Sequence, residues 1–136
     1  SIPENNLDEL VQKLSSIGAL DHAKHVVDEV FEKEDAINQG ISYFNDERFW
    51  ECHEVFEGIW INTNGEEKFL LQGLILVAAA LVHYQKDEDN VCINIFNRVL
   101  EKLERSKGVY YNIDLDRIKK IISEMIISKK ISSFQI

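Results

Sequence analysis

The segment Asn62-Thr63-Asn64-Gly65 constrains the fold more than any other feature of this chain. These residues favour a turn, and they separate two long stretches with helical apolar spacing, residues 47–61 and 66–85. A connection this short joins neighbouring antiparallel helices. We therefore expect a helical hairpin at the centre of the chain.

Apolar residues at three- and four-residue spacing continue on both sides of this hairpin and end at short polar clusters. One proline and six glycines in 136 residues leave little of the turn signal that an all-β chain needs. The sequence therefore predicts an all-α fold: a bundle of six or seven helices built on an antiparallel hairpin, with flanking N- and C-terminal helices. Beyond the hairpin, the expected helices cover residues 4–14, 19–33, 36–44, 91–103 and 115–131.

Length and charge indicate one domain with three parts. A chain of 136 residues that is 45% hydrophobic and 29% charged is typical of a single globular domain, 1–136. Residues 1–107 have 10 basic and 21 acidic side chains, whereas 108–136 have 5 and 3, so the net charge changes from −11 to +2. We expect an N-terminal helical extension (1–33), a core (34–107) and a C-terminal amphipathic helix (108–136).

Composition also argues against several classes of protein. A net charge of −9 disfavours nucleic-acid binding, which depends on clustered cations. The longest apolar run, Leu74 to Val82, has nine residues, whereas a membrane span takes about 20, so we expect a buried core helix and no membrane partner. Cys52 and Cys92 form no CxxC pair, and no export signal is visible, so we expect a protein of the reducing cytoplasm. We also expect no cofactor.

The first helix of the hairpin places a histidine among aromatic residues. At about 100° per residue from Phe49, Trp60 falls near 20°, His53 near 40° and Phe56 near −20°. Glu57 falls near 80°, one turn from His53, where its carboxylate could orient the ring and raise its basicity. His53 and Glu57 are thus the candidate polar pair of this helix.

The second helix is expected to complete this cluster. Counting outward from the turn places Gln72 opposite Glu57, so the sequence predicts a polar cluster of His53, Glu57 and Gln72 in an apolar seam. One reading of the cluster is structural, because satisfied buried polar groups can fix the register of packed helices. The other is that it binds a ligand or takes part in catalysis.

Two further residues of the second helix have expected neighbours. His83 should lie near Asp46 and Phe49, because eleven residues of helix separate it from Gln72 by about 16 Å. Gly73 is unfavourable inside a helix by about 1 kcal/mol, and we expect it to admit the bulky Trp60 or its backbone.

Together, the two helices resemble a known family. The segments are FNDERFWECHEVFEGIW and LLQGLILVAAALVHYQK, and they are similar to the archaeal and bacterial proteins grouped as domain of unknown function 309. The resemblance covers about 35–107 and implies an all-helical bundle but no activity. Cys52 stands where a small residue often precedes the motif histidine. The positions that match the family's motif are His53, Glu54, Glu57, Trp60, Gln72, Gly73 and Ala79, with Ala80 and His83 matched less strictly.

We expect a non-enzymatic binding or assembly module, because the chain lacks phosphate loops, nucleophile elbows and dinucleotide fingerprints. The partner would be a small ligand or a protein, or a second copy docked through the isoleucine-rich C-terminal helix. The candidate ligand-binding residues are Trp50, His53, Glu57, Trp60, Gln72 and His83.

The alternative is a hydrolase-like enzyme or a metal-binding protein in which Glu57 orients His53 as a general base, so these two are the catalytic candidates. No metal is assigned, because a zinc-protease motif would need histidine at position 57 and His53 with Glu57 supplies only two ligands. His22 and His25, with Glu29, form a weaker second cluster that we interpret as exposed.

Overall fold

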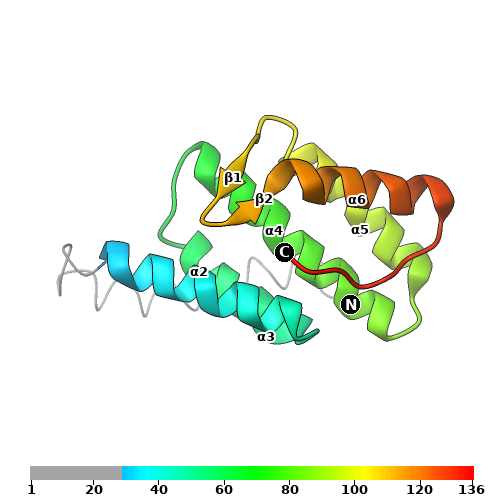
Figure 1. Cartoon of the computed structure of the whole chain (residues 1–136), viewed down its shortest axis with the longest axis horizontal. Coiled ribbons are helices and arrows are strands. Elements are labelled where there is room, and N and C mark those ends of the chain that lie inside the picture. Colours follow the sequence, from blue (N-terminus) through cyan, green and yellow to red (C-terminus); the bar gives the residue numbers. More distant parts are fainter. Residues whose placement is uncertain (1–28) are drawn as a thin grey trace.

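The computed structural model describes residues 29–136, and within them the chain is predominantly helical, as predicted (Figure 1). The expected helix over 4–14, most of the one over 19–33, and His22 and His25 lie outside these residues. The described elements are the helices α2 Glu29–Asn45, α3 Phe49–Trp60, α4 Glu66–Gln85, α5 Asp89–Lys102 and α6 Leu115–Ser128, with the strands β1 Val109–Tyr110 and β2 Ile113–Asp114.

Helix α2 is continuous, and the predicted break after Lys33 is wrong. Glu34 and Asp35 are both exposed, so they occupy the solvent face of a helix and do not end it. Gly40 allows α2 to approach α3 closely, because a Cβ built there would lie 2.8 Å from Cζ of Phe56 and closer still to Cε1. The α2–α3 contact therefore depends on a glycine that the sequence analysis did not single out.

Helices α3 and α4 pack against each other across the turn that the sequence indicates. The Oγ1 of Thr63 donates a hydrogen bond to the carbonyl oxygen of Ile59, 2.8 Å away, and Gly65 adopts a positive φ of 70° before α4 begins. At the other end, Nε2 of Gln85 donates to the carbonyl oxygen of Glu47 over 2.9 Å. The start of α3 thus lies beside the end of α4, as in an antiparallel pair.

Helix α4 forms the centre of the bundle and contacts both α3 and α5 (Figure 1). By length and composition it could cross a membrane, but 67% of its most apolar window is buried within the protein. A helix that is apolar on all sides and covered by its neighbours is a core helix.

The strands β1 and β2 form a short antiparallel hairpin that the all-α prediction missed. Val109 pairs with Asp114 and Tyr110 with Ile113, while Tyr111 and Asn112 form the turn with positive φ angles of 45° and 69°. Only asparagine among the two turn residues favours that conformation, so the sequence has a weak hairpin signal.

Helix α6 ends at Ser128, earlier than the predicted Ile131, because Lys129 adopts a left-handed conformation with a φ of 58°. Residues 129–136 then return to the end of α2. There the backbone N–H of Ile136 donates to Oδ1 of Asn45 over 2.7 Å, and the Phe134 and Phe44 rings lie 5.3 Å apart. The buried residues of α6 are Leu115, Ile118, Ile122 and Met125.

Glu67 links α2, α4 and the hairpin. Its Oε2 accepts a hydrogen bond from the Tyr110 hydroxyl over 2.7 Å and lies 2.6 Å from Nζ of Lys33. We expect Tyr110→Phe to lower the free energy of unfolding by about 1–2 kcal/mol, because the hydroxyl bonds a charged acceptor in a half-buried place. Urea denaturation measures the change. Tyr111→Phe is the matched control, since the Tyr111 hydroxyl has no hydrogen bond within residues 29–136, and an equal effect of both variants would contradict the expectation.

Candidate functional site

The structure places His53 and Glu57 together on the inner side of α3, as the helical spacing predicts. Their side chains are 2% and 0% exposed, and Nε2 of His53 lies 3.1 Å from Oε1 of Glu57. That distance is within hydrogen-bond range, but the two groups are not aligned for a hydrogen bond. The pair is therefore a buried contact, held in place by the packing of α3.

Burial dominates the electrostatics of this pair. It lowers the pKa of His53 to about 4, and it raises the pKa of Glu57 to about 8, with a further contribution from the negative charge of Glu54. Both shifts favour the uncharged forms, so near neutral pH the pair is an imidazole beside a carboxylic acid. The expected rise in the basicity of His53 does not occur, because desolvation outweighs the effect of the neighbouring carboxyl group.

Gln72 does not close the predicted cluster. It is half-buried on α4, and it forms no hydrogen bond with His53 or Glu57. Within residues 29–136, the buried side-chain atoms without a hydrogen-bond partner are Nδ1 of His53, both carboxyl oxygens of Glu57 and Nε1 of Trp60. All belong to one flank of α3, so the unsatisfied polar groups of the described chain are concentrated there.

The two tryptophans occupy different environments. Trp50 is 46% exposed and stacks on the His53 ring, with ring centroids 5.3 Å apart and an interplanar angle of 13°. Trp60 is buried, and Nζ of Lys68 lies 4.4 Å from its ring centroid. Trp50 thus covers the outer side of the histidine, and the predicted place for it in the apolar seam with Trp60 is wrong.

His83 and Gly73 have neighbours that the sequence analysis did not name. His83 is fully buried, and its Nδ1 lies 3.1 Å from Oε1 of Glu88, at the start of α5. A Cβ on Gly73 would lie 2.7 Å from Cδ2 of Leu103 and 3.4 Å from Cβ of Lys102, so the close approach comes from the C-terminal end of α5 and the predicted approach of Trp60 is wrong. Both residues therefore serve the contact between α4 and α5.

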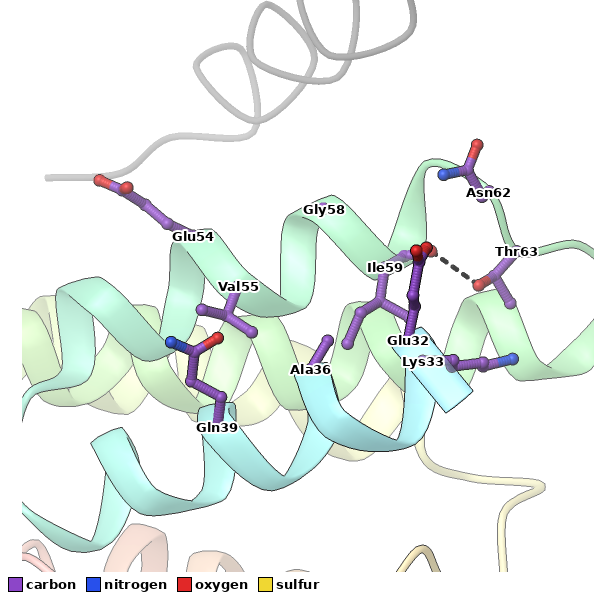
Figure 2. Close-up of a pocket in the computed structure, with 10 residues that line it drawn as sticks. All are labelled: Glu32, Lys33, Ala36, Gln39, Glu54, Val55, Gly58, Ile59, Asn62 and Thr63. Atoms are coloured by element: carbon purple, nitrogen blue, oxygen red, sulfur yellow. Dashed lines mark hydrogen bonds between the residues drawn. The ribbon is translucent and has the colours of Figure 1, made fainter. Parts of the chain in front are cut away.

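A groove of about 550 Å³ lies between α2 and α3, and none of the predicted site residues lines it. Figure 2 shows Val55 and Ile59 of α3 and Ala36 of α2 directed toward the space between the two helices. Gly58 continues this apolar floor. The polar residues around the floor are Glu32, Lys33, Gln39, Glu54, Asn62 and Thr63.

The sequence contained a partial signal for this groove. Small residues on two neighbouring helices, Ala36 and Gly58, leave space between them, and a Cβ on Gly58 would have no atom within 4 Å. The pairing of α2 with α3 along this face was not predictable from periodicity alone, because the break predicted after Lys33 divided α2 into two helices.

The described residues form no cluster of potential metal ligands. Within 29–136, no group of three or more His, Cys, Asp or Glu side chains is placed to hold one. Cys52 and Cys92 are free and buried; burial raises the pKa of both thiols, and the charge of Asp89 adds to the shift of Cys92. Thiols in this state are poor nucleophiles and poor ligands.

Comparison with known families matches residues 37–94 to the model described as Domain of unknown function (DUF309). The match begins within α2, includes all of α3 and α4, and ends within α5. No curated protein matches the chain. This match confirms, over residues 37–94, the resemblance of α3 and α4 to this family.

Proposed function

We propose that this protein is a non-enzymatic binding module that receives an amphipathic helix of a protein partner between α2 and α3. The observation that carries this proposal is the groove, with a floor of Ala36, Val55, Gly58 and Ile59 and polar residues along its edges. Helix-in-groove recognition uses an apolar channel of this kind between two helices. A volume of about 550 Å³ also falls in the range of binding sites.

The charges at the edges indicate what kind of helix fits. Glu32 on α2 and Glu54 on α3 place one acid on each side of the groove. The nearby cation, Lys33, lies 2.6 Å from Glu67 and is engaged there. An acidic edge on a chain of net charge −9 favours a partner helix that carries Lys or Arg beside its apolar stripe.

The alternative, a hydrolase or metal protein that uses His53 oriented by Glu57, has less support. The His53 ring is 2% exposed, Trp50 stacks on it, and it does not line the groove. A general base also works best with a pKa near the operating pH, whereas burial lowers the pKa of His53 to about 4. The pair is better explained as a structural contact that specifies how α3 packs.

The C-terminal helix α6 and the two cysteines bear on the oligomeric state and the cellular compartment of the protein. Because α6 directs four apolar residues into its own bundle, a role for it in forming a homo-oligomer is less supported than groove binding. A cytoplasmic location stays part of the proposal, since Cys52 and Cys92 are both free thiols.

Titration with a labelled peptide tests this function. The probe is a fluorescein-labelled helical peptide of about 18 residues, with leucines at three- and four-residue spacing flanked by lysines, followed by fluorescence anisotropy. We expect a micromolar Kd that weakens with added salt, because the acidic edge contributes to binding. A peptide with serines in place of the leucines should not bind.

A matched pair of variants locates the binding site. Gly58→Phe projects a ring into the groove where no atom lies within 4 Å of the new Cβ, and we expect it to weaken binding at least tenfold. Glu101→Phe places the same side chain at an exposed position on α5 and should leave the Kd unchanged. Equal affinity of Gly58→Phe and the wild type would overturn the proposal.

A further inference from the structure

Among the described residues that line the α2–α3 groove, Lys33 is the single cation. Its Nζ lies 2.6 Å from Oε2 of Glu67, which belongs to the first turn of α4 and does not line the groove. Figure 2 shows the Lys33 side chain at the Thr63 end of the groove, with its amino group directed away from Ala36. Lys33 thus borders the groove, while its charge is paired with a residue outside it.

The Tyr110 hydroxyl and the start of α4 keep Glu67 ionised and in position. Tyr110 donates a hydrogen bond over 2.7 Å to the same carboxylate oxygen that contacts Lys33. Burial acts to raise the pKa of Glu67, but the hydrogen bonds from Lys33 and Tyr110 and the charge of Lys33 lower it overall. A carboxylate in the first turn of a helix is also favoured by the helix dipole. Glu67 is therefore a fixed negative charge beside Lys33.

The pairing decides which charges the groove presents to a partner. With Lys33 held by Glu67, the acids Glu32 and Glu54 face no free cation among the described lining residues. A released Lys33 could reach a bound helix, where it would repel lysines and attract acids. Lys33 lies outside residues 37–94, so the match to the family model does not account for this pairing.

We propose that Glu67 is a specificity-determining residue of the groove: it holds the Lys33 ammonium away from the partner and neutralises it, so that basic helices are selected over acidic ones. This inference rests on the proposed function, and it assigns the charge preference to a residue that does not line the groove. Glu67 acts through Lys33 and is a positioning residue.

Two labelled peptides on the same protein test this role. The first is the fluorescein-labelled peptide with leucines flanked by lysines (the lysine peptide), and the second has glutamates in place of its lysines (the glutamate peptide). Fluorescence anisotropy at low ionic strength gives the Kd of each, and the ratio of the two values is the charge selectivity. A folding defect would weaken both peptides alike and leave this ratio unchanged. We expect the wild type to bind the lysine peptide more tightly.

Glu67→Gln should lower the selectivity about tenfold, with a Kd about threefold weaker for the lysine peptide and about threefold tighter for the glutamate peptide, as expected for one partly exposed charge pair. Glu66→Gln is the matched control. It removes an exposed carboxylate from the preceding position of α4, and within residues 29–136 Glu66 forms no ion pair with Lys33. Its selectivity should stay close to that of the wild type.

The same substitutions in a Lys33→Gln background show whether the effect passes through Lys33. In that background, Glu67→Gln should change the selectivity no more than Glu66→Gln does, because no lysine is released. A full effect of Glu67→Gln without Lys33 would contradict the positioning role.

Three further outcomes would overturn the inference: equal selectivity of Glu67→Gln and the wild type, an equal loss of selectivity in Glu66→Gln, or equal affinity of the wild type for both peptides. Each leaves groove binding standing, provided that the wild type binds the lysine peptide and Gly58→Phe weakens that binding. If the wild type binds neither peptide, the proposed function fails, and the inference fails with it.

Discussion

Raising the pH from about 6.5 to 8 will lower the free energy of unfolding of this protein, and Glu57→Gln will abolish most of that loss. Glu57 is fully buried, and burial, with the charge of Glu54, raises its pKa from 4.5 to about 8. A carboxyl group whose pKa is raised by folding contributes stability that is complete below its unfolded pKa and is lost as the pH rises through the folded value. Each pH unit in that window costs about 1 kcal/mol.

His53 acts in the opposite direction and in a lower pH range. Burial lowers its pKa from 6.5 to about 4, so its contribution is complete above pH 6.5 and is lost as the pH falls toward 4. Between about 4.5 and 6.5 the slopes of the two residues oppose each other and largely cancel. The interval above pH 6.5 therefore isolates the ionisation of Glu57.

Urea denaturation at several pH values between about 6.5 and 8 measures this effect. We expect the wild type to lose about 1–2 kcal/mol across the interval and Glu57→Gln to stay nearly constant. Glu101→Gln, which removes an exposed carboxyl group of α5, should follow the wild type. A Glu57→Gln variant that loses stability as steeply as the wild type would show that Glu57 ionises freely in the folded protein.

Two glycine substitutions on neighbouring helices will have opposite effects on stability. Gly40→Ala should lower the free energy of unfolding by about 1–3 kcal/mol, because the new methyl group overlaps the buried ring of Phe56. Gly58→Ala should raise it by up to about 1 kcal/mol, because its Cβ meets no atom within 4 Å and alanine favours the helix. Since both sites are helical, the difference between the variants reports packing.

Thermal or urea unfolding of both variants measures these changes, and a double-mutant cycle with Phe56→Leu locates their cause. The smaller leucine should remove part of the penalty of Gly40→Ala, since the two residues are in contact. Gly58→Ala should have the same effect in both backgrounds. If Gly40→Ala costs as much with Leu at position 56 as with Phe, the clash between these two residues is not the cause.

The helical class and most of the helices could be predicted because apolar periodicity is a local property of the chain. The pattern of residues 47–61 gave nearly the bounds of α3, and it directed His53 inward, where the structure has it. The apolar spacing gave wrong predictions where contacts between separate helices determine the structure. Glu34 and Asp35 were predicted to end a helix, although α2 continues through them. Gly73 was expected to admit Trp60, but it makes room for Leu103, the residue directly after α5.

The candidate site was predictable in its residues but not in its chemistry. Spacing alone places His53 and Glu57 one helical turn apart. Whether the contact with Glu57 raises or lowers the pKa of His53 depends on how much water the surrounding helices exclude. The packing of these helices leaves the two side chains 2% and 0% exposed, so it favours the uncharged forms of His53 and Glu57.

The sequence by itself determined which stretches are helical and which of their faces are apolar, because three- and four-residue spacing follows from the geometry of one helix. Only the tertiary structure decided which helices touch, and so where the groove between α2 and α3 lies and how the buried pair titrates. These properties arise from side chains of separate helices that meet in space, and no pattern within a single helix contains them.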